Sequence, residues 1–240
     1  MPTITLENAA KYYKQDKNSG RGKRTEIGVI DVTLTVEQGE FVFVTGSSGA
    51  GKSTLLQLMA CETPPSRGSI FLDGVNVTHM TQRQRQQRRL RFGYVPQLSS
   101  LIRKRTIEEN LTAVAVLGRG RGHMAPDKRV QKALNMVGMG DAAKRYPVEL
   151  SMGQCRRVEL ARAIINNPDI LVLDELTANL DEDTAWDMFL FLSEINYHGI
   201  TVIMATHAKK FVNLMRRRVI TLVDGNVFGD VPKGRYGDVV

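Results

Sequence analysis

A glycine-rich stretch with one lysine, from Gly46 to Ser53, has the composition of a loop that binds phosphate. It fits the pattern GxxxxGK[ST], in which backbone N–H groups surround phosphate oxygens and glycines leave the backbone bare enough to approach them. We expect Lys52 to contact the β- and γ-phosphates of a nucleotide, and a hydroxyl of Ser53 or Thr54 to face Mg²⁺. The residues predicted to bind ATP here are Gly46, Ser47, Ser48, Gly49, Ala50, Gly51, Lys52, Ser53 and Thr54, with Ser53 also a metal ligand.

Two adjacent carboxylates, Asp174 and Glu175, follow four apolar residues and could supply the second half of such a site. We expect Asp174 to hold Mg²⁺ through its hydration shell, from a strand next to the phosphate loop. Glu175 is the candidate that orients or deprotonates water, a role worth on the order of 10² to 10⁴ in rate for general bases. The alternative interpretation of Asp174 and Glu175 is a surface acidic pair at the end of a strand. The alternative interpretation of the loop is a glycine turn that contains a lysine by chance.

Apolar and helical patterns alternate along the chain and place both motifs at the ends of strands. The alternation predicts an α/β fold with a mainly parallel sheet and the glycine turn at its carboxyl edge. Residues 14–26 are polar and basic and predict an exposed loop. Strands are predicted at about 3–13, 41–44, 92–95, 170–175 and 201–207, hairpins at 69–77 and 219–231, and helices at 52–61, 81–91, 106–118, 127–138, 151–167, 182–196 and 209–217.

The composition is that of a globular protein, with 42% apolar and 24% charged residues in 240. A net charge of +8 favours anionic partners such as nucleotide, nucleic acid or an acidic membrane surface. Cys61 and Cys155 lie too far apart in the sequence to suggest a zinc site or a disulfide framework. No apolar run approaches the roughly 18 to 20 residues that span a bilayer, and the first residues lack a secretion signal, so we expect a cytoplasmic protein.

Five further short motifs resemble those of the ATP-binding cassette (ABC) ATPases, in the order that this family requires. "LSMGQ", residues 150–154, resembles the signature sequence; Gln97 matches the Q-loop, Asp181 ends a D-loop, His207 matches the switch histidine and Tyr13 the A-loop aromatic. The resemblance implies a P-loop NTPase (RecA-like) core, an antiparallel β subdomain and an inserted α-helical signature subdomain at about 98–157. All of residues 1–240 would then form a single nucleotide-binding domain.

The resemblance also implies roles for three of these side chains. Gln97 would reach Mg²⁺ or the attacking water, and an ordinary strand-end glutamine is the alternative. His207 would contact the γ-phosphate, and a core histidine is the alternative. Tyr13 would stack on adenine, although Tyr12 is adjacent and either ring could instead pack in the core.

The signature segment implies a second copy of the chain. In the family, residues at the positions of Ser151, Gly153 and Gln154 contact the ATP bound by a partner subunit, so that two protomers enclose two ATP molecules. Hydrolysis removes the γ-phosphate that both subunits hold, and the homodimer then loosens. Met152 replaces the usual first glycine of the signature pair, from which we expect slower closure or hydrolysis. Leu176 replaces a proline, a conformational change that we expect the site to tolerate.

Within this family the chain most resembles the FtsE group of cell-division ATPases, on "ELSMGQCRRVELARAIINNPDILVLDELTANLD", the segments after it and a terminal "KGRYG". The resemblance implies an integral membrane partner like FtsX, a location on the inner face of the membrane, and regulation of peptidoglycan hydrolases. ATPases of lipoprotein-release or macrolide export, or a slow nucleotide-dependent switch, are the alternatives. Only about fifty residues separate Gln97 from Leu150, too few for the long coiled-coil arm of the DNA-repair relatives.

The segment after Gln97 is where the family receives its membrane partner. Leu98, Leu101 and Ile102 could form an apolar socket there or could belong to the core. Basic residues without any acid between 83 and 105 could attract anionic lipid or an acidic tail of the partner, or could form a solvated helix face. Because the segment lacks interleaved aromatic residues and fits no DNA-binding motif, no nucleic-acid partner is expected.

Overall fold

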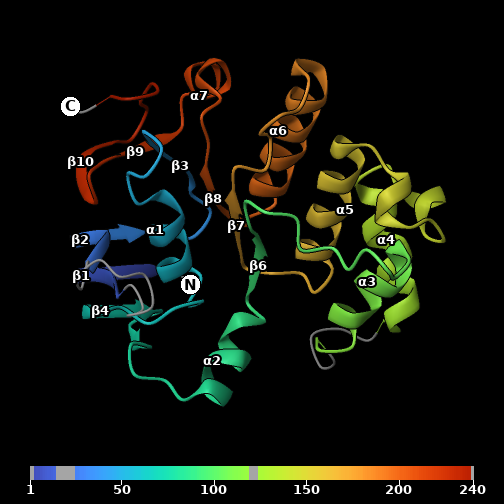
Figure 1. Ribbon diagram of the computed structural model, residues 1–240, viewed down its shortest axis with the longest axis horizontal. Helices are drawn as coiled ribbons and strands as arrows, with labels where there is room; N and C mark the ends of the chain where they lie inside the picture. The colour runs from blue at the N-terminus through green and yellow to red at the C-terminus, as the bar shows by residue number, and fades with distance from the viewer. Residues whose placement is uncertain (1–2, 15–24, 119–123, 239–240) are drawn as a thin grey trace, which may run out of the picture.

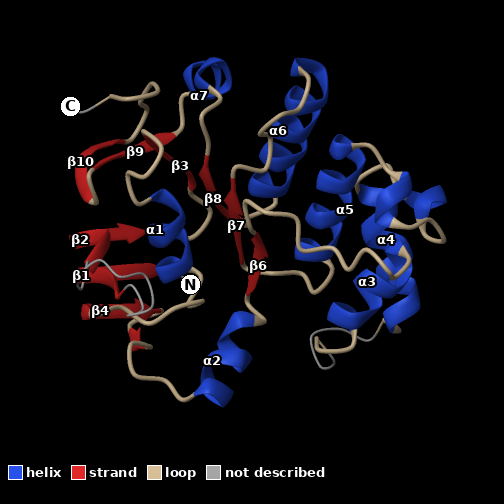
Figure 2. Cartoon of the chain, in the orientation of Figure 1, coloured by secondary structure: helices blue, strands red, loops and turns tan. Residues whose placement is uncertain are grey.

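A six-stranded sheet runs through the middle of the molecule, with strand order β10-β9-β3-β8-β7-β6 (Figures 1 and 2). The computed structural model describes residues 3–14, 25–118 and 124–238. Neighbouring strands of this sheet are parallel except for β9 and β10, which confirms the predicted mainly parallel sheet. Its strands are β3 (Phe41–Gly46), β6 (Phe92–Val95), β7 (Ile170–Asp174), β8 (Thr201–Ala205), β9 (Arg218–Val223) and β10 (Asn226–Val231).

A second sheet is wholly antiparallel, with order β2-β1-β4-β5. Its predicted hairpin is present, and Asp73 and Gly74 both have positive φ, as a tight two-residue turn requires. The strand β2 was not predicted, and Thr25 and Glu26, which were assigned to a loop, begin it; residues 15–24 of that loop lie outside the described part of the chain. The strands are β1 (Ile4–Lys14), β2 (Thr25–Val36), β4 (Arg67–Leu72) and β5 (Val75–Asn76).

The parallel strands are covered on both faces, which explains their continuous apolar sequences. Successive residues of β3 point into different cores, with Phe41 and Phe43 in one and Val42 and Val44 in the other. The helix α1 (Lys52–Met59) packs in the second core together with the antiparallel sheet. In Figure 1, β8 and β7 run between α1 and the helix α6 (Glu182–Tyr197), which belongs to the first core. The phosphate loop is thereby anchored between two packed layers.

Three helices come between β6 and β7 in the sequence and form the right-hand part of Figure 1: α3 (Ile107–Ala115), α4 (Pro126–Met136) and α5 (Met152–Ile164). Capping boxes begin two of them, with Thr106 before α3 and Ser151 before α5 each accepting a hydrogen bond from the backbone three residues later. Short 3₁₀ turns at Gly140–Ala142 and Pro147–Glu149 join α4 to α5. These helices are the inserted helical subdomain of the predicted fold class, and its limits at about 98–157 stay a prediction.

The remaining helices, α2 (Gln82–Arg89) and α7 (Lys209–Met215), begin close to their predicted starts. Both α1 and α7 end two residues earlier than predicted, because Cys61 and Arg216, which lie beyond these helices, have left-handed backbones. Cys61 and Cys155 are free cysteines. Across the described ranges, we find no helix with both the length and the apolar character needed to cross a bilayer.

Candidate active site

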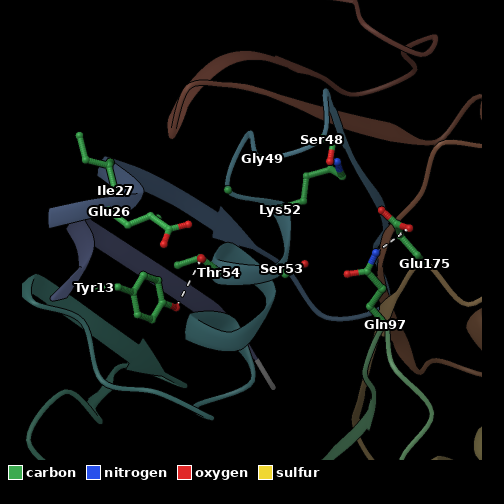
Figure 3. Close-up of a pocket in the computed structure, with 12 residues that line it drawn as sticks. Tyr13, Glu26, Ile27, Ser48, Gly49, Lys52, Ser53, Thr54, Gln97 and Glu175 are labelled. Atoms are coloured by element: carbon green, nitrogen blue, oxygen red, sulfur yellow. Dashed lines mark hydrogen bonds between the residues drawn. The ribbon is translucent and has the colours of Figure 1, made fainter. Parts of the chain in front are cut away.

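A cavity of about 180 Å³ lies where the loop after β3 meets the first turn of α1 (Figure 3). Figure 3 shows Tyr13, Glu26 and Ile27 at one end and Gln97 and Glu175 at the other. The cavity brings together nine of the predicted site residues, from four separate stretches of the chain. Its lining is Tyr13, Glu26, Ile27, Gly28, Ser48, Gly49, Gly51, Lys52, Ser53, Thr54, Gln97 and Glu175.

Neighbouring backbone is a further reason for two glycines of the loop. A Cβ on Gly51 would lie 2.2 Å from the carbonyl oxygen of Gly28, and one on Gly46 would lie 2.4 Å from that of Leu222. Gly49, with φ near 80°, has open space where a side chain would stand. The closeness of strands β2 and β9 therefore excludes side chains at Gly51 and Gly46, and the approach of bare backbone to a phosphate stays a prediction.

Lys52 is held at the head of the loop by backbone carbonyls. Its Nζ donates to the oxygens of Gly46 at 3.0 Å and Ser47 at 2.9 Å, and it lies 3.2 Å from Nε2 of His207. Burial lowers the pKa of Lys52, and the carboxylates of Glu175 and Asp174 oppose that shift. The side chain of Ala50 packs in the core, so Ala50, like Gly46, offers only its backbone to this site.

The strand β8, and not β7, is the neighbour of β3, so the expectation that the carboxylates come from the adjacent strand was wrong. Strand β8 lies between β3 and β7, and His207 follows the end of β8. The Nε2 atom of His207 consequently lies 3.2 Å from Lys52 Nζ and 3.2 Å from Oε1 of Glu175. Because nearly half of the His207 side chain is exposed, the alternative of a core histidine does not hold.

Glu175 is the point at which the predicted catalytic residues meet. The amide nitrogen Nε2 of Gln97 donates to its Oε2 at 3.0 Å, while His207 faces its Oε1. Glu175 has φ near 51°, a left-handed backbone, and the next residue, Leu176, is fully buried in the core. The leucine that replaces proline thus anchors the chain directly after the carboxylate.

Asp174 and Ser53 form a pair whose chemistry suits a divalent cation. Asp174 is buried, its Oδ1 has no hydrogen-bond partner among the described residues, and the Ser53 hydroxyl hydrogen-bonds the same carboxylate group. Burial raises the pKa of Asp174, and the Ser53 hydrogen bond opposes this. A buried carboxylate oxygen without a partner needs an explanation, and a hydrated Mg²⁺, which takes one or two protein oxygens and keeps its waters, supplies one. The residues present therefore fit Mg²⁺.

Tyr13, rather than Tyr12, lines the cavity. Its hydroxyl lies 3.4 Å from both Thr54 Oγ1 and Gln57 Oε1, whereas the backbone N–H of Tyr12 donates to the Ser66 hydroxyl. The Tyr13 ring is therefore the one available to a nucleotide base at this end of the cavity. Its stacking on adenine stays a prediction.

The signature segment is not part of this cavity in the described chain. The Ser151 hydroxyl accepts from the Gln154 N–H at 3.3 Å, and the Gln154 side chain accepts from the Ser151 N–H at 2.9 Å. Met152 is 55% exposed at the start of α5, and a Cβ on Gly153 would lie 3.1 Å from the methyl group of Thr184. The contact of Ser151, Gly153 and Gln154 with a nucleotide bound by a second copy stays a prediction.

The loop after Gln97 divides between core and surface. Leu101 is 8% exposed and packs in the core, whereas Leu98 is 81% and Ile102 50% exposed, so the predicted apolar socket includes at most these two. In the basic segment, Arg89 pairs with Glu62 and Arg91 with Asp73 and Asp169, while four exposed cations have no carboxylate partner in the described structure: Arg83, Arg103, Lys104 and Arg105.

Three residues that sequence reasoning missed also shape the site. Gly28 allows Thr54 and Tyr13 to close on β2, and a glycine inside a strand pattern is the signal that could have identified it. The buried Arg156 of α5 donates to the carbonyls of Pro96 at 3.3 Å and Gln97 at 2.7 Å, which ties the Q-loop backbone to the signature helix. Tyr236 contacts His207, and no local pattern signals this.

A mainly parallel sheet whose glycine loop and acidic strand end line one cavity, with a histidine beside the lysine of the loop, defines a P-loop nucleotide hydrolase. The ABC transporter family model matches residues 29–178, and the chain belongs to the ABC ATPases. It is an ATP-binding and ATP-hydrolysing subunit. It is 40% identical over 207 residues to the cell division ATP-binding protein FtsE of Bacillus subtilis (strain 168), covering 86% of this chain and 90% of that protein.

Two further comparisons extend over almost the whole chain. FtsE of Streptococcus pneumoniae serotype 2 (strain D39 / NCTC 7466) is 36% identical over 238 residues, which cover 99% of each chain. The ATP-binding cassette MJ0796, solved as a dimer in a post-hydrolysis state with ADP and Pi, superposes with a TM-score of 0.86 at 30% identity, covering 97% of this chain and 100% of that one. These proteins have the same fold as this chain.

Proposed function

We propose that this chain is the ATPase of a cell-division complex of the FtsE–FtsX type, bound to the inner face of the membrane through an integral partner. The 36% identity to FtsE over 99% of both chains supports this assignment. The exposed Leu98, Ile102 and the unpaired cations at 103–105 offer a surface for that partner. The partner would transmit the cycle to peptidoglycan hydrolases outside the membrane.

The observation that carries the proposed mechanism is the convergence of Gln97 and His207 on Glu175, with Lys52 at 3.2 Å from the histidine. Lys52 and His207 bind the γ-phosphate, and Glu175 accepts a hydrogen bond from the attacking water and takes its proton. Gln97 holds the carboxylate and the water in line. The Tyr13 ring and the backbone of the loop orient the remainder of the nucleotide.

Ser53, Asp174 and Gln97 would hold Mg²⁺ at the same end of the cavity. Bound there, the ion neutralises charge on the β- and γ-phosphate oxygens. Ser151, Gly153 and Gln154 of a second copy complete the site, so that ATP binding joins two chains and hydrolysis separates them. The cassette MJ0796, solved as a dimer with ADP and Pi, supports the pairing of two copies.

Glu175→Gln tests the chemistry, because it keeps the shape of the side chain and removes the base. We expect kcat to fall by about 10² to 10⁴, with ATP affinity retained and an ATP-bound dimer that accumulates on size-exclusion chromatography. The same change at the exposed Glu194 of α6 is the matched control. Equal turnover in wild type and Glu175→Gln would exclude Glu175 as the base.

The complex is tested separately by purifying the tagged chain from the native membranes and identifying the integral protein that accompanies it. We expect a single FtsX-like partner, and reconstitution with it in lipid vesicles should raise the ATPase rate. Recovery of a lipoprotein-release or macrolide-export permease instead would overturn the cell-division assignment and leave the ATPase mechanism intact.

A further inference from the structure

The segment that follows β10 returns to the active site and brings Tyr236 against His207. The Tyr236 hydroxyl lies 3.1 Å from Nδ1 of His207, 29 positions away in the sequence. The histidine is therefore held from two sides: Nδ1 faces the phenol, and Nε2 faces Glu175 and Lys52. No step of the mechanism above uses this contact.

Hydrogen bonds to α7 and β9 fix the position of this segment. The backbone N–H of Tyr236 donates to the side chain of Asn213 at 2.8 Å, and the Thr221 hydroxyl donates to the carbonyl of Asp238 at 2.7 Å. The Lys209 ammonium lies 5.3 Å from the centre of the Tyr236 ring. The contact with His207 is thus held by an ordered surface that extends over several residues on each side.

The direction of the proton in this contact follows from the surroundings of the phenol. Burial raises the pKa of Tyr236, the Glu175 carboxylate raises it further, and a hydrogen bond from the Gly46 backbone opposes both. Tyr236 therefore keeps its proton at neutral pH. A phenol that keeps its proton can donate it, and an acceptor within reach is Nδ1 of His207.

We propose that Tyr236 is a positioning residue that holds neutral His207 in the tautomer with its proton on Nε2. A neutral imidazole carries one donor and one acceptor nitrogen, so donation from the phenol to Nδ1 leaves Nε2–H as the donor. That N–H faces the Glu175 carboxylate at 3.2 Å and is the group that a γ-phosphate oxygen would accept from. The benefit to catalysis rests on the proposed role of His207, whereas the tautomer itself does not.

The Lys52 ammonium supplies the competing arrangement. It lies 3.2 Å from Nε2 and can only donate, so it favours an unprotonated Nε2 and a proton on Nδ1 directed at the phenol oxygen. Two of its donors already bind the Gly46 and Ser47 carbonyls. The two tautomers place the proton on different nitrogens, and a spectrum that identifies the protonated nitrogen distinguishes them.

The test is a long-range ¹H–¹⁵N NMR spectrum of the full chain with ¹⁵N-labelled histidine, recorded without nucleotide at a pH where the imidazole is neutral. The His207 signals are assigned by their loss in His207→Gln. We expect the wild type to carry the proton on Nε2 and Tyr236→Phe to show a mixture of tautomers. Tyr197→Phe, at an 88% exposed tyrosine, is the control and should leave the His207 signals unchanged. A wild-type spectrum with the proton on Nδ1, or no change in Tyr236→Phe, would overturn the proposal.

Kinetics separates this proposal from the role of His207 itself. Loss of one hydrogen-bond partner predicts that Tyr236→Phe lowers kcat by about 5- to 10-fold, with the KM for ATP and magnesium within about twofold, since the phenol does not line the cavity. If His207→Ala retains wild-type turnover, the proposed role of His207 fails, while the spectrum still decides the tautomer. If His207→Ala is inactive and the tautomer is unaffected by Tyr236→Phe, only the proposal for Tyr236 fails.

Discussion

Gly28→Ala should weaken nucleotide binding without removing any group that takes part in the chemistry. The new Cβ would lie 2.6 Å from the Thr54 methyl carbon, 2.9 Å from the Thr54 hydroxyl and 3.0 Å from the Tyr13 ring. Non-bonded carbons are in best contact at about 3.5 to 4.0 Å, so the methyl group must move by about 1 Å. Thr54 and Tyr13 both line the cavity, and their displacement changes the end of it that faces the base.

The size of the effect follows from the cost of overpacking. Inserting a methyl group into a packed contact costs about 1 to 3 kcal/mol. If binding requires Thr54 and Tyr13 in their original places, that cost appears as a Kd for ATP about 5- to 150-fold higher. Stability should fall less, because the φ of Gly28 is not positive and the alanine gains about 0.4 to 1 kcal/mol through the unfolded chain.

Equilibrium titration with a fluorescent ATP analogue and magnesium measures the Kd, and steady-state kinetics at saturating ATP should give a kcat near that of the wild type. Gln97 and Glu175, at the far end of the cavity in Figure 3, are untouched by the change. In Gly28→Ala combined with Thr54→Ser, the methyl group at 2.6 Å is gone, and we expect at least half of the lost affinity to return. An affinity for Gly28→Ala within twofold of the wild type would refute the reasoning.

Three further predictions concern stability. Leu101→Ala should lower the free energy of unfolding, measured with urea, by about 2 to 5 kcal/mol, and Leu98→Ala should lower it by at most about 0.5 kcal/mol. Equal losses would contradict the division of the loop after Gln97 into core and surface residues. Ser151→Ala should lower the free energy of unfolding by about 1 kcal/mol, because α5 loses its N-terminal cap, and Ser151→Thr, which keeps a capping hydroxyl, should lower it much less. An equal loss of stability in both variants would contradict the capping role. Burial raises the pKa of Cys61 from 9.0 to about 11. The buried neutral thiol therefore contributes its full stabilisation to the folded state below about pH 9, and this contribution is lost as the pH rises toward 11. From about pH 8 to pH 10.5 the wild type should therefore lose more stability than Cys61→Ala, and parallel losses would exclude the thiol as the cause.

The individual elements of the fold could be predicted because the signals for each lie within a few residues. The apolar run of β3 followed by glycine and lysine, the Asp73-Gly74 turn and the helix that begins after Ser151 all occur in the structure. The strand β2 was missed although Val32, Leu34 and Val36 alternate with polar residues and are buried. The end of α1 was placed too late because the left-handed backbone of Cys61 has no local signal.

The sequence by itself determined which residues are the candidates for contact with a nucleotide: backbone preferences and side-chain chemistry within short motifs predict a phosphate loop, a carboxylate pair and a switch histidine. Only the tertiary structure decided how they meet. Strand β8 lies between β3 and β7, which puts His207 between Lys52 and Glu175, and the return of the chain after β10 brings Tyr236 to the same imidazole. These contacts join residues far apart in the chain, and they depend on strand order and on the packing of two cores, which no local period of the sequence encodes.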